Sequence, residues 1–173
     1  EHPDVAITSD NIGFAYRYKG DYDKAIEHHE KALAIFLKTL GSEHPDVVMS
    51  YVNVGLAYRM KGEYDKAIGY FEKSLKHLLK TVGPEHLDVA ISYDNLGAAY
   101  AGKGEYDKAI EYYEKSLAII LKAQDADPWQ LSNTYSNLGA AFAKKGEYDE
   151  AIEYFEKSLA ISLKTLGSGH PNV

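Results

Sequence analysis

Histidines and carboxylates give this chain its clearest capacity for chemistry, because imidazole and carboxylate groups bind metals and transfer protons. The sequence has seven histidines, and four of them occupy the same position of a repeated motif: His2, His44, His86 and His170. Equivalent positions of a repeat lie about one unit apart, which is too far for one metal ion to join them. His28 and His29 are adjacent and point in different directions on a helix, and His77 stands alone. The histidine pattern therefore predicts no metal site.

The other residue types that support catalysis are equally scattered. The carboxylates lie on charged helix faces, without an apolar cleft that could raise a pKa. Glycines recur in the sequence Gly-Glu-Tyr at helix joints, which does not match a phosphate-binding loop. There is no cysteine, so a disulfide framework and a thiolate metal site are excluded. We expect no catalytic residue, no cofactor and no enzymatic activity.

The chain is built from one unit of 42 residues that is written four times. The same glycine recurs in every unit as Gly13, Gly55, Gly97 and Gly139. The same alanine recurs as Ala25, Ala67, Ala109 and Ala151. Such self-similarity indicates a solenoid, in which each unit buries its apolar face against its neighbours. We expect a single array with repeats at about 3–44, 45–86, 87–127 and 128–170, and, because both ends resemble the internal joints, part of a longer array.

Each unit predicts two amphipathic helices. In the first unit, one helix runs from about Pro3 to Lys19, since proline suits the first helical turn and Gly20 ends the helix. The second helix starts near Tyr22 and stops at Gly41. The fold class that we expect is all-α, a right-handed α-solenoid of four helix-turn-helix units with eight helices and no strand. Its breaks should fall near Gly20, Gly41, Gly62, Gly83, Gly104, Asp125 and Gly146. Four tyrosines should occupy equivalent, largely buried sites: Tyr22, Tyr64, Tyr106 and Tyr148.

The residues that recur also identify a family. The third unit carries the set Leu96, Gly97, Tyr100, Gly104, Tyr106, Ala109, Tyr113, Ser116 and Leu117. This set resembles the tetratricopeptide repeat, whose small residues lie at tight helix crossings. The unit length of 42 residues, against about 34 in the usual repeat, and the joint LGSEHPDV are similar to the kinesin light chain variety. The resemblance covers the whole chain and implies a scaffold for protein–protein interaction.

Composition limits the partners. The net charge is −7 and the pI is about 5.5, which argues against binding to a nucleic-acid backbone. No apolar run is long enough to span a membrane, so we expect no membrane partner. The absence of cysteine is compatible with a reducing compartment, and we expect a cytoplasmic protein.

One side of each first helix remains available for binding. At about 100° per residue, positions 7, 10, 11, 14, 17 and 18 lie together, on the side opposite Ile12 and Tyr16. The resemblance implies that this side, the first-helix face, lines a concave groove that holds an extended or short helical segment of a partner. The candidate contact residues are Asn11, Phe14, Arg17, Tyr18, Asn53, Leu56, Arg59, Met60, Asn95 and Asn137.

These residues have distinct expected roles. The resemblance implies that the asparagines hold the backbone of the ligand, since a carboxamide both donates and accepts hydrogen bonds. Arg17 and Arg59 would bind an acidic side chain or a terminal carboxylate, so the partner could be acidic. Each role has an alternative. The asparagines could bond to the neighbouring unit, and the arginines could pair with Asp21 and Glu63. A further apolar set on this face could instead pack between units: Ile7, Met49 and Ile91.

Two regions depart from the simple array. At the third joint, Pro128 falls one position early, Asp127 is a good N-cap, and Trp129 predicts either a bend or contact point or an apolar plug between units. At the last helix, apolar residues should remain uncovered: Ile152, Phe155, Leu159 and Leu163. We expect end-to-end self-association of the fragment there, either as a two-fold pair or as a continuous superhelix. Two other functions therefore stay open, a structural spacer or self-association segment without a peptide ligand and a sensor arm of a larger signalling protein.

Overall fold

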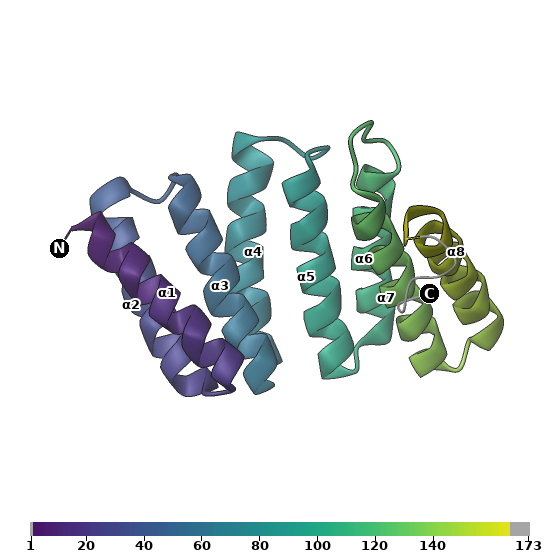
Figure 1. Cartoon of the computed structure of the whole chain (residues 1–173), viewed down its shortest axis with the longest axis horizontal. Coiled ribbons are helices and arrows are strands. Elements are labelled where there is room, and N and C mark those ends of the chain that lie inside the picture. The colour runs from purple at the N-terminus through teal and green to yellow at the C-terminus, as the bar shows by residue number, and fades with distance from the viewer. Residues whose placement is uncertain (1, 167–173) are drawn as a thin grey trace. The chain divides into compact units, whose positions relative to one another are not determined.

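The structure, a computed structural model, describes residues 2–166, which form eight α-helices and no strand (Figure 1). The helices are α1 (Pro3–Lys19), α2 (Tyr22–Leu40), α3 (Pro45–Lys61), α4 (Tyr64–Thr81), α5 (Leu87–Lys103), α6 (Tyr106–Ile120), α7 (Pro128–Lys145) and α8 (Tyr148–Leu166). The predicted number, order and approximate bounds of the helices are confirmed. The largest difference is at the third joint, where α6 ends before Leu121 and the break predicted near Asp125 is longer than the others.

The helix ends follow from local chemistry. Gly20 has a φ of 83°, and its N–H and that of Asp21 donate to the carbonyls of Arg17 and Tyr16, which closes the end of α1. The starts of the first helices show a feature that the sequence reasoning missed. The imidazole Nδ1 of His2 accepts a hydrogen bond from the backbone N–H of Asp4. The same cap recurs at His44 and His86, so these three histidines cap first helices, while the fourth repeated histidine, His170, lies outside the described residues.

The chain divides into two compact units, which are described separately: α1–α4 form unit 1 and α5–α8 form unit 2. Within each unit, helices that follow one another in sequence pack side by side. The fully buried alanines Ala25, Ala67 and Ala109 lie on the second helices, where the sequence placed small residues at tight contacts. None of the helices in the described range 2–166 is long and apolar enough to cross a membrane.

The repeated glycine of each first helix brings the two helices of a repeat into close contact. A Cβ atom built on Gly55 would lie 2.6 Å from a ring carbon of Phe71, and one on Gly97 would lie 2.6 Å from Tyr113. Gly13 faces His29 in the same way. A glycine here is therefore required by space, since an aromatic ring or an imidazole fills the place of the missing side chain.

Two expectations about aromatic residues are wrong. Tyr22, Tyr64 and Tyr106 are half-buried, and Tyr148 is 66% exposed, so these tyrosines are not largely buried and not equivalent. They are the first residues of the second helices, and among the described residues only α7 packs closely on the helix of Tyr148. Trp129 is 72% exposed, which rules out an apolar plug at the third joint. Asp127 does cap α7 as predicted, by accepting from the N–H of Trp129.

Candidate functional site

The first-helix face carries exposed apolar side chains in both units. Ile7, Met49 and Ile91 hold the same position of successive repeats and are 50%, 59% and 46% exposed. Tyr18 and Met60 form a second pair of equivalent residues, and both are exposed. The alternative for Ile7, Met49 and Ile91, that they pack between neighbouring repeats, is therefore wrong. Large apolar side chains in solvent are typical of surfaces that bind other proteins.

Two arginines lie at the C-terminal ends of α1 and α3 on this face. The guanidinium of Arg17 lies 5.0 Å from the ring centre of Phe14 and 5.6 Å from that of Tyr18. Arg59 is half-buried like Arg17, and in both the Nε atom is buried without a hydrogen-bond partner. Both arginines lie in the last turn of their helices, just before the left-handed glycines Gly20 and Gly62.

The alternative ion pairs of these arginines are absent from the described residues. The carboxylate of Asp21 pairs with Lys24, with 3.0 Å between Nζ and Oδ2. The carboxylate of Glu63 pairs with Lys61 and Lys66. Across residues 2–166, no ion pair joins Arg17 or Arg59 to an acidic side chain, so each guanidinium keeps donors for another acceptor.

The four asparagines do not share one environment. Asn11 is exposed, and Asn95 and Asn137 are half-buried. Asn53 is only 3% exposed, and its amide Nδ2 donates to Asp10 Oδ2 at 2.9 Å, which joins α3 to α1. For Asn53 the structure thus contains the bond between repeats that was the alternative to ligand binding, and its burial leaves little surface for a ligand.

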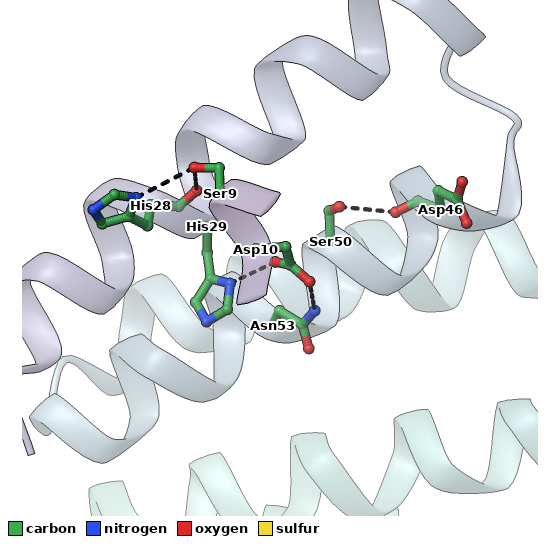
Figure 2. A network of polar contacts seen from close by, with 7 residues as sticks. All are labelled: Ser9, Asp10, His28, His29, Asp46, Ser50 and Asn53. Carbon is green, nitrogen blue, oxygen red and sulfur yellow. Dashed lines mark hydrogen bonds and ion pairs between the residues drawn. The ribbon is translucent and has the colours of Figure 1, made fainter. Parts of the chain in front are cut away.

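Asp10 is the centre of a polar network that links three helices (Figure 2). Its second carboxylate oxygen lies 2.6 Å from Nδ1 of His29, which is fully buried on α2. His29 occupies the place that Phe71, Tyr113 and Phe155 hold in the other repeats. The sequence reasoning gave His29 no role, although a histidine in a column of aromatic residues was a usable signal. The network positions α1 against α3 and thereby fixes the spacing of the two first-helix faces in unit 1.

Unit 2 joins its first helices through an equivalent carboxylate. Asp94 Oδ2 on α5 accepts a hydrogen bond of 2.9 Å from the hydroxyl of Thr134 on α7. Thr134 is fully buried, and like Asn53 in unit 1 it donates the hydrogen bond that joins two first helices. Burial raises the pKa of Asp94 to about 6, and the hydrogen bond from Thr134 opposes this shift only in part.

The raised pKa of Asp94 predicts how stability depends on pH. Between the unfolded value near 3.8 and the folded value of about 6, the folded state binds a proton that the unfolded state lacks, so stability falls as pH rises through this window. We expect Asp94→Asn to be more stable than the wild type at pH 7 by about 1–3 kcal/mol, and this difference should shrink toward pH 4. Urea unfolding across the pH range measures it. The exposed Asp125→Asn is the matched control, and equal pH profiles for the two variants would refute the assignment.

The residues that the structure places on this surface are mainly apolar, aromatic and cationic side chains. Within the described part of the chain, no three histidine or acidic side chains lie close enough to hold a metal ion. The surface combines cationic donors, aromatic rings and flexible methionines, a combination that recurs where proteins bind peptides.

Comparisons with known proteins agree with this architecture. Tetratricopeptide repeat family models match residues 4–80, 53–122 and 131–172. The crystal structure of BtubC (BKLC) from P. vanneervenii is 27% identical, with a TM-score of 0.86, over 100% of this chain and 69% of that one. A kinesin light chain-type protein from Podosopora anserina with nearly identical TPR-like repeats is 31% identical, with a TM-score of 0.81, over 99% of this chain and 81% of that one.

The apo form of RapI is 26% identical, with a TM-score of 0.80, and matches 95% of this chain and 58% of its own length. No curated protein matches the sequence significantly. The repeated glycines and the helix pairs within each compact unit agree with these matches, and the chain belongs to the tetratricopeptide repeat family, in its kinesin light chain-like variety.

Proposed function

We propose that the chain is a protein-interaction scaffold whose first-helix face binds an acidic, partly apolar segment of a partner protein. Membership of the tetratricopeptide repeat family supports a scaffold in general. The finer proposal rests on one observation. The first-helix face carries exposed apolar side chains together with Arg17 and Arg59, and neither arginine forms an ion pair with an acidic side chain of residues 2–166.

The chemistry of unit 1 suits such a segment. Ile7 and Met49 offer an aliphatic surface to apolar side chains of the ligand, at about 25 cal/mol for each Å² buried. Arg17 and Arg59 supply charge-assisted hydrogen bonds to carboxylates, which are shorter and stronger than neutral ones. Asn11 is exposed and able to bond to the backbone of the ligand. The net charge of −7 of the whole chain would repel an acidic ligand, so the arginines also select where it binds.

Unit 2 offers a smaller and more polar face. Ile91 is the exposed apolar residue of α5, and Asn95 and Asn137 are half-buried. The positions equivalent to the two arginines hold Ala101 and Ala143. We therefore assign the acidic ligand to unit 1 and propose no acidic contact for unit 2.

The test uses a displayed library of random peptides enriched in aspartate and glutamate, selected on the 173-residue chain. For a selected peptide, Arg17→Gln combined with Arg59→Gln should raise the Kd at least about tenfold, or about 1.4 kcal/mol. The corresponding change to glutamate should raise the Kd further. Binding by the wild type should weaken with salt more steeply than binding by either variant.

Lys76→Gln is the matched control, because Lys76 is exposed on α4 and its position is exposed in every repeat. Circular dichroism melting of all variants separates lost binding from lost folding. A selected peptide whose affinity is the same for the wild type and the arginine variants would refute the proposed site.

A second candidate function, self-association, is favoured by a separate observation. On α8, Ile152 is 55% exposed, Phe155 41%, Leu159 49% and Leu163 40%. An apolar helix face of this extent in water favours association with a complementary surface. We propose that the chain also associates end to end through this face.

A further inference from the structure

We infer that a second copy of the chain docks head to tail, with its α1 on the apolar face of α8, in the register that the chain already uses between its own repeats. This inference rests on the proposed self-association and specifies its geometry. The pattern for the contact is the packing of α6 on α7 inside unit 2. There, Ile110 and Tyr113 of α6 form one buried cluster with Leu138 and Ala141 of α7.

Unit 1 repeats the same contact between α2 and α3. Ile26 corresponds to Ile110 and is 7% exposed, while Val54 corresponds to Leu138 and is fully buried. Two repeat junctions in separately packed units therefore bury the same positions. The junction is a property of the repeat and does not depend on its place in the chain.

The surface of α8 and the surface of α1 that correspond to the two sides of this junction are both exposed. Ile152 of α8 corresponds to Ile110, yet it is 55% exposed where Ile110 is 8% exposed. Ile12 of α1 corresponds to Leu138, yet it is 39% exposed where Leu138 is fully buried. A shallow hollow of about 300 Å³ marks this side of α1 and is lined by Asp4, Val5, Thr8, Ser9, Ile12, His28 and Lys31. The exposed face of α8 thus lacks a covering first helix, and the exposed face of α1 lacks a covering second helix, so each could cover the other.

The polar contacts of the internal junctions are also complementary across two copies. Lys61 pairs with Asp23 at 2.7 Å in unit 1, and Lys145 pairs with Asp107 at 2.7 Å in unit 2. The same spacing places Lys19 of an incoming copy opposite Asp149 of α8, and both are exposed.

A second polar contact follows the same rule. The hydroxyls of Tyr58 and Tyr70 donate to one carboxylate oxygen of Glu30, at 2.9 and 3.0 Å. The corresponding residues across two copies are Tyr16 and His28 of one and Glu156 of the other. In this register, residues 1–5 of the incoming copy correspond to the repeat positions that residues 169–173 already hold in the sequence of the first copy. We therefore infer a contact that uses α1 only from Thr8 onward.

A contact between two different surfaces leaves one free surface at each end of the pair. Further copies can therefore add, and the assembly grows as an open series unless the rotation closes a ring. This behaviour separates the head-to-tail contact from a two-fold pair of α8 helices, which would stop at a dimer.

The test is sedimentation velocity of the whole chain over a range of concentrations, with Ile12→Glu and Ile152→Glu as variants that block one surface each. The wild type should form dimers and larger species, and each variant alone should be monomeric at concentrations at least tenfold higher. An equimolar mixture of the two variants should form dimers and nothing larger, because one intact surface remains on each partner. Lys19→Glu should weaken association, and combining it with Asp149→Lys in the same chain should restore it.

Trp129→Glu is the matched control, since Trp129 is an exposed apolar residue that lies on neither α1 nor α8. It should leave the association of the chain unchanged. A wild type that is monomeric at every concentration overturns both the self-association and its register. Association that persists in Ile12→Glu, or that Trp129→Glu abolishes, overturns the register alone and leaves self-association through another surface.

Discussion

Gly55→Ala is expected to destabilise the chain by about 1–3 kcal/mol, even though alanine is the better helix former by about 1 kcal/mol. The new Cβ would lie 2.6 Å from a ring carbon of Phe71, a side chain that is 1% exposed and has no room to move aside. The overpacking must therefore separate α3 from α4 or force the ring from its rotamer. Urea unfolding followed by circular dichroism measures the change in the free energy of unfolding.

Gly69→Ala supplies the matched control within the same helix pair. Gly69 lies inside α4, and a Cβ built on it would meet no atom within 4 Å. The same substitution should there raise the free energy of unfolding by about 0.5–1 kcal/mol. If Gly55→Ala were neutral or stabilising, the close packing of the repeated glycine would not be what holds each helix pair together.

Asp10→Ala is expected to have the other large effect, a loss of about 2–4 kcal/mol. The substitution removes the acceptor of two groups at once, Nδ1 of the fully buried His29 and the amide of Asn53. A buried donor without an acceptor costs its full desolvation energy. Chemical denaturation of the variant against the wild type gives the size of the loss.

A double-mutant cycle isolates the histidine from the rest of the network. His29→Phe inserts the residue that Phe71 represents in the next repeat, where the ring packs on Gly55. In the Asp10→Ala background this second substitution should recover about 1–2 kcal/mol, because the buried imidazole no longer lacks an acceptor. Strictly additive losses would show that His29 and Asp10 do not depend on each other.

The sequence was sufficient for the helices and for the glycine contacts. Gly13 and its equivalents recur at one spacing, and small residues at fixed spacing predict close helix crossings whatever the distant context. Helix starts at Pro3 and ends at Gly20 follow from backbone restrictions that act within a few residues. These features are local, so one sequence contains all the information that they need.

The asparagines and histidines were harder to assign, because their partners lie in other repeats. Asn53 bonds to Asp10, which is 43 residues away, and no helical spacing within one unit points to that pair. The repeat was the misleading signal here: Asn11 and Asn53 hold the same position, yet one is exposed and the other buried. Which side of a helix is covered depends on the neighbour that packs there. The exposure of Trp129 depends on tertiary packing in the same way.

The most direct test of the proposed interaction scaffold observes the first-helix face while a ligand binds. The chain has two methionines, Met49 and Met60, and both are exposed on this face in unit 1. Its one tryptophan, Trp129, is exposed at the start of α7 in unit 2, outside the unit to which we assign the acidic ligand. Methyl NMR of methionine-labelled chain, titrated with a selected acidic peptide, should shift both methyl signals and leave the indole N–H signal of Trp129 in place. Saturable binding of that peptide with both methyl signals unmoved would contradict the account.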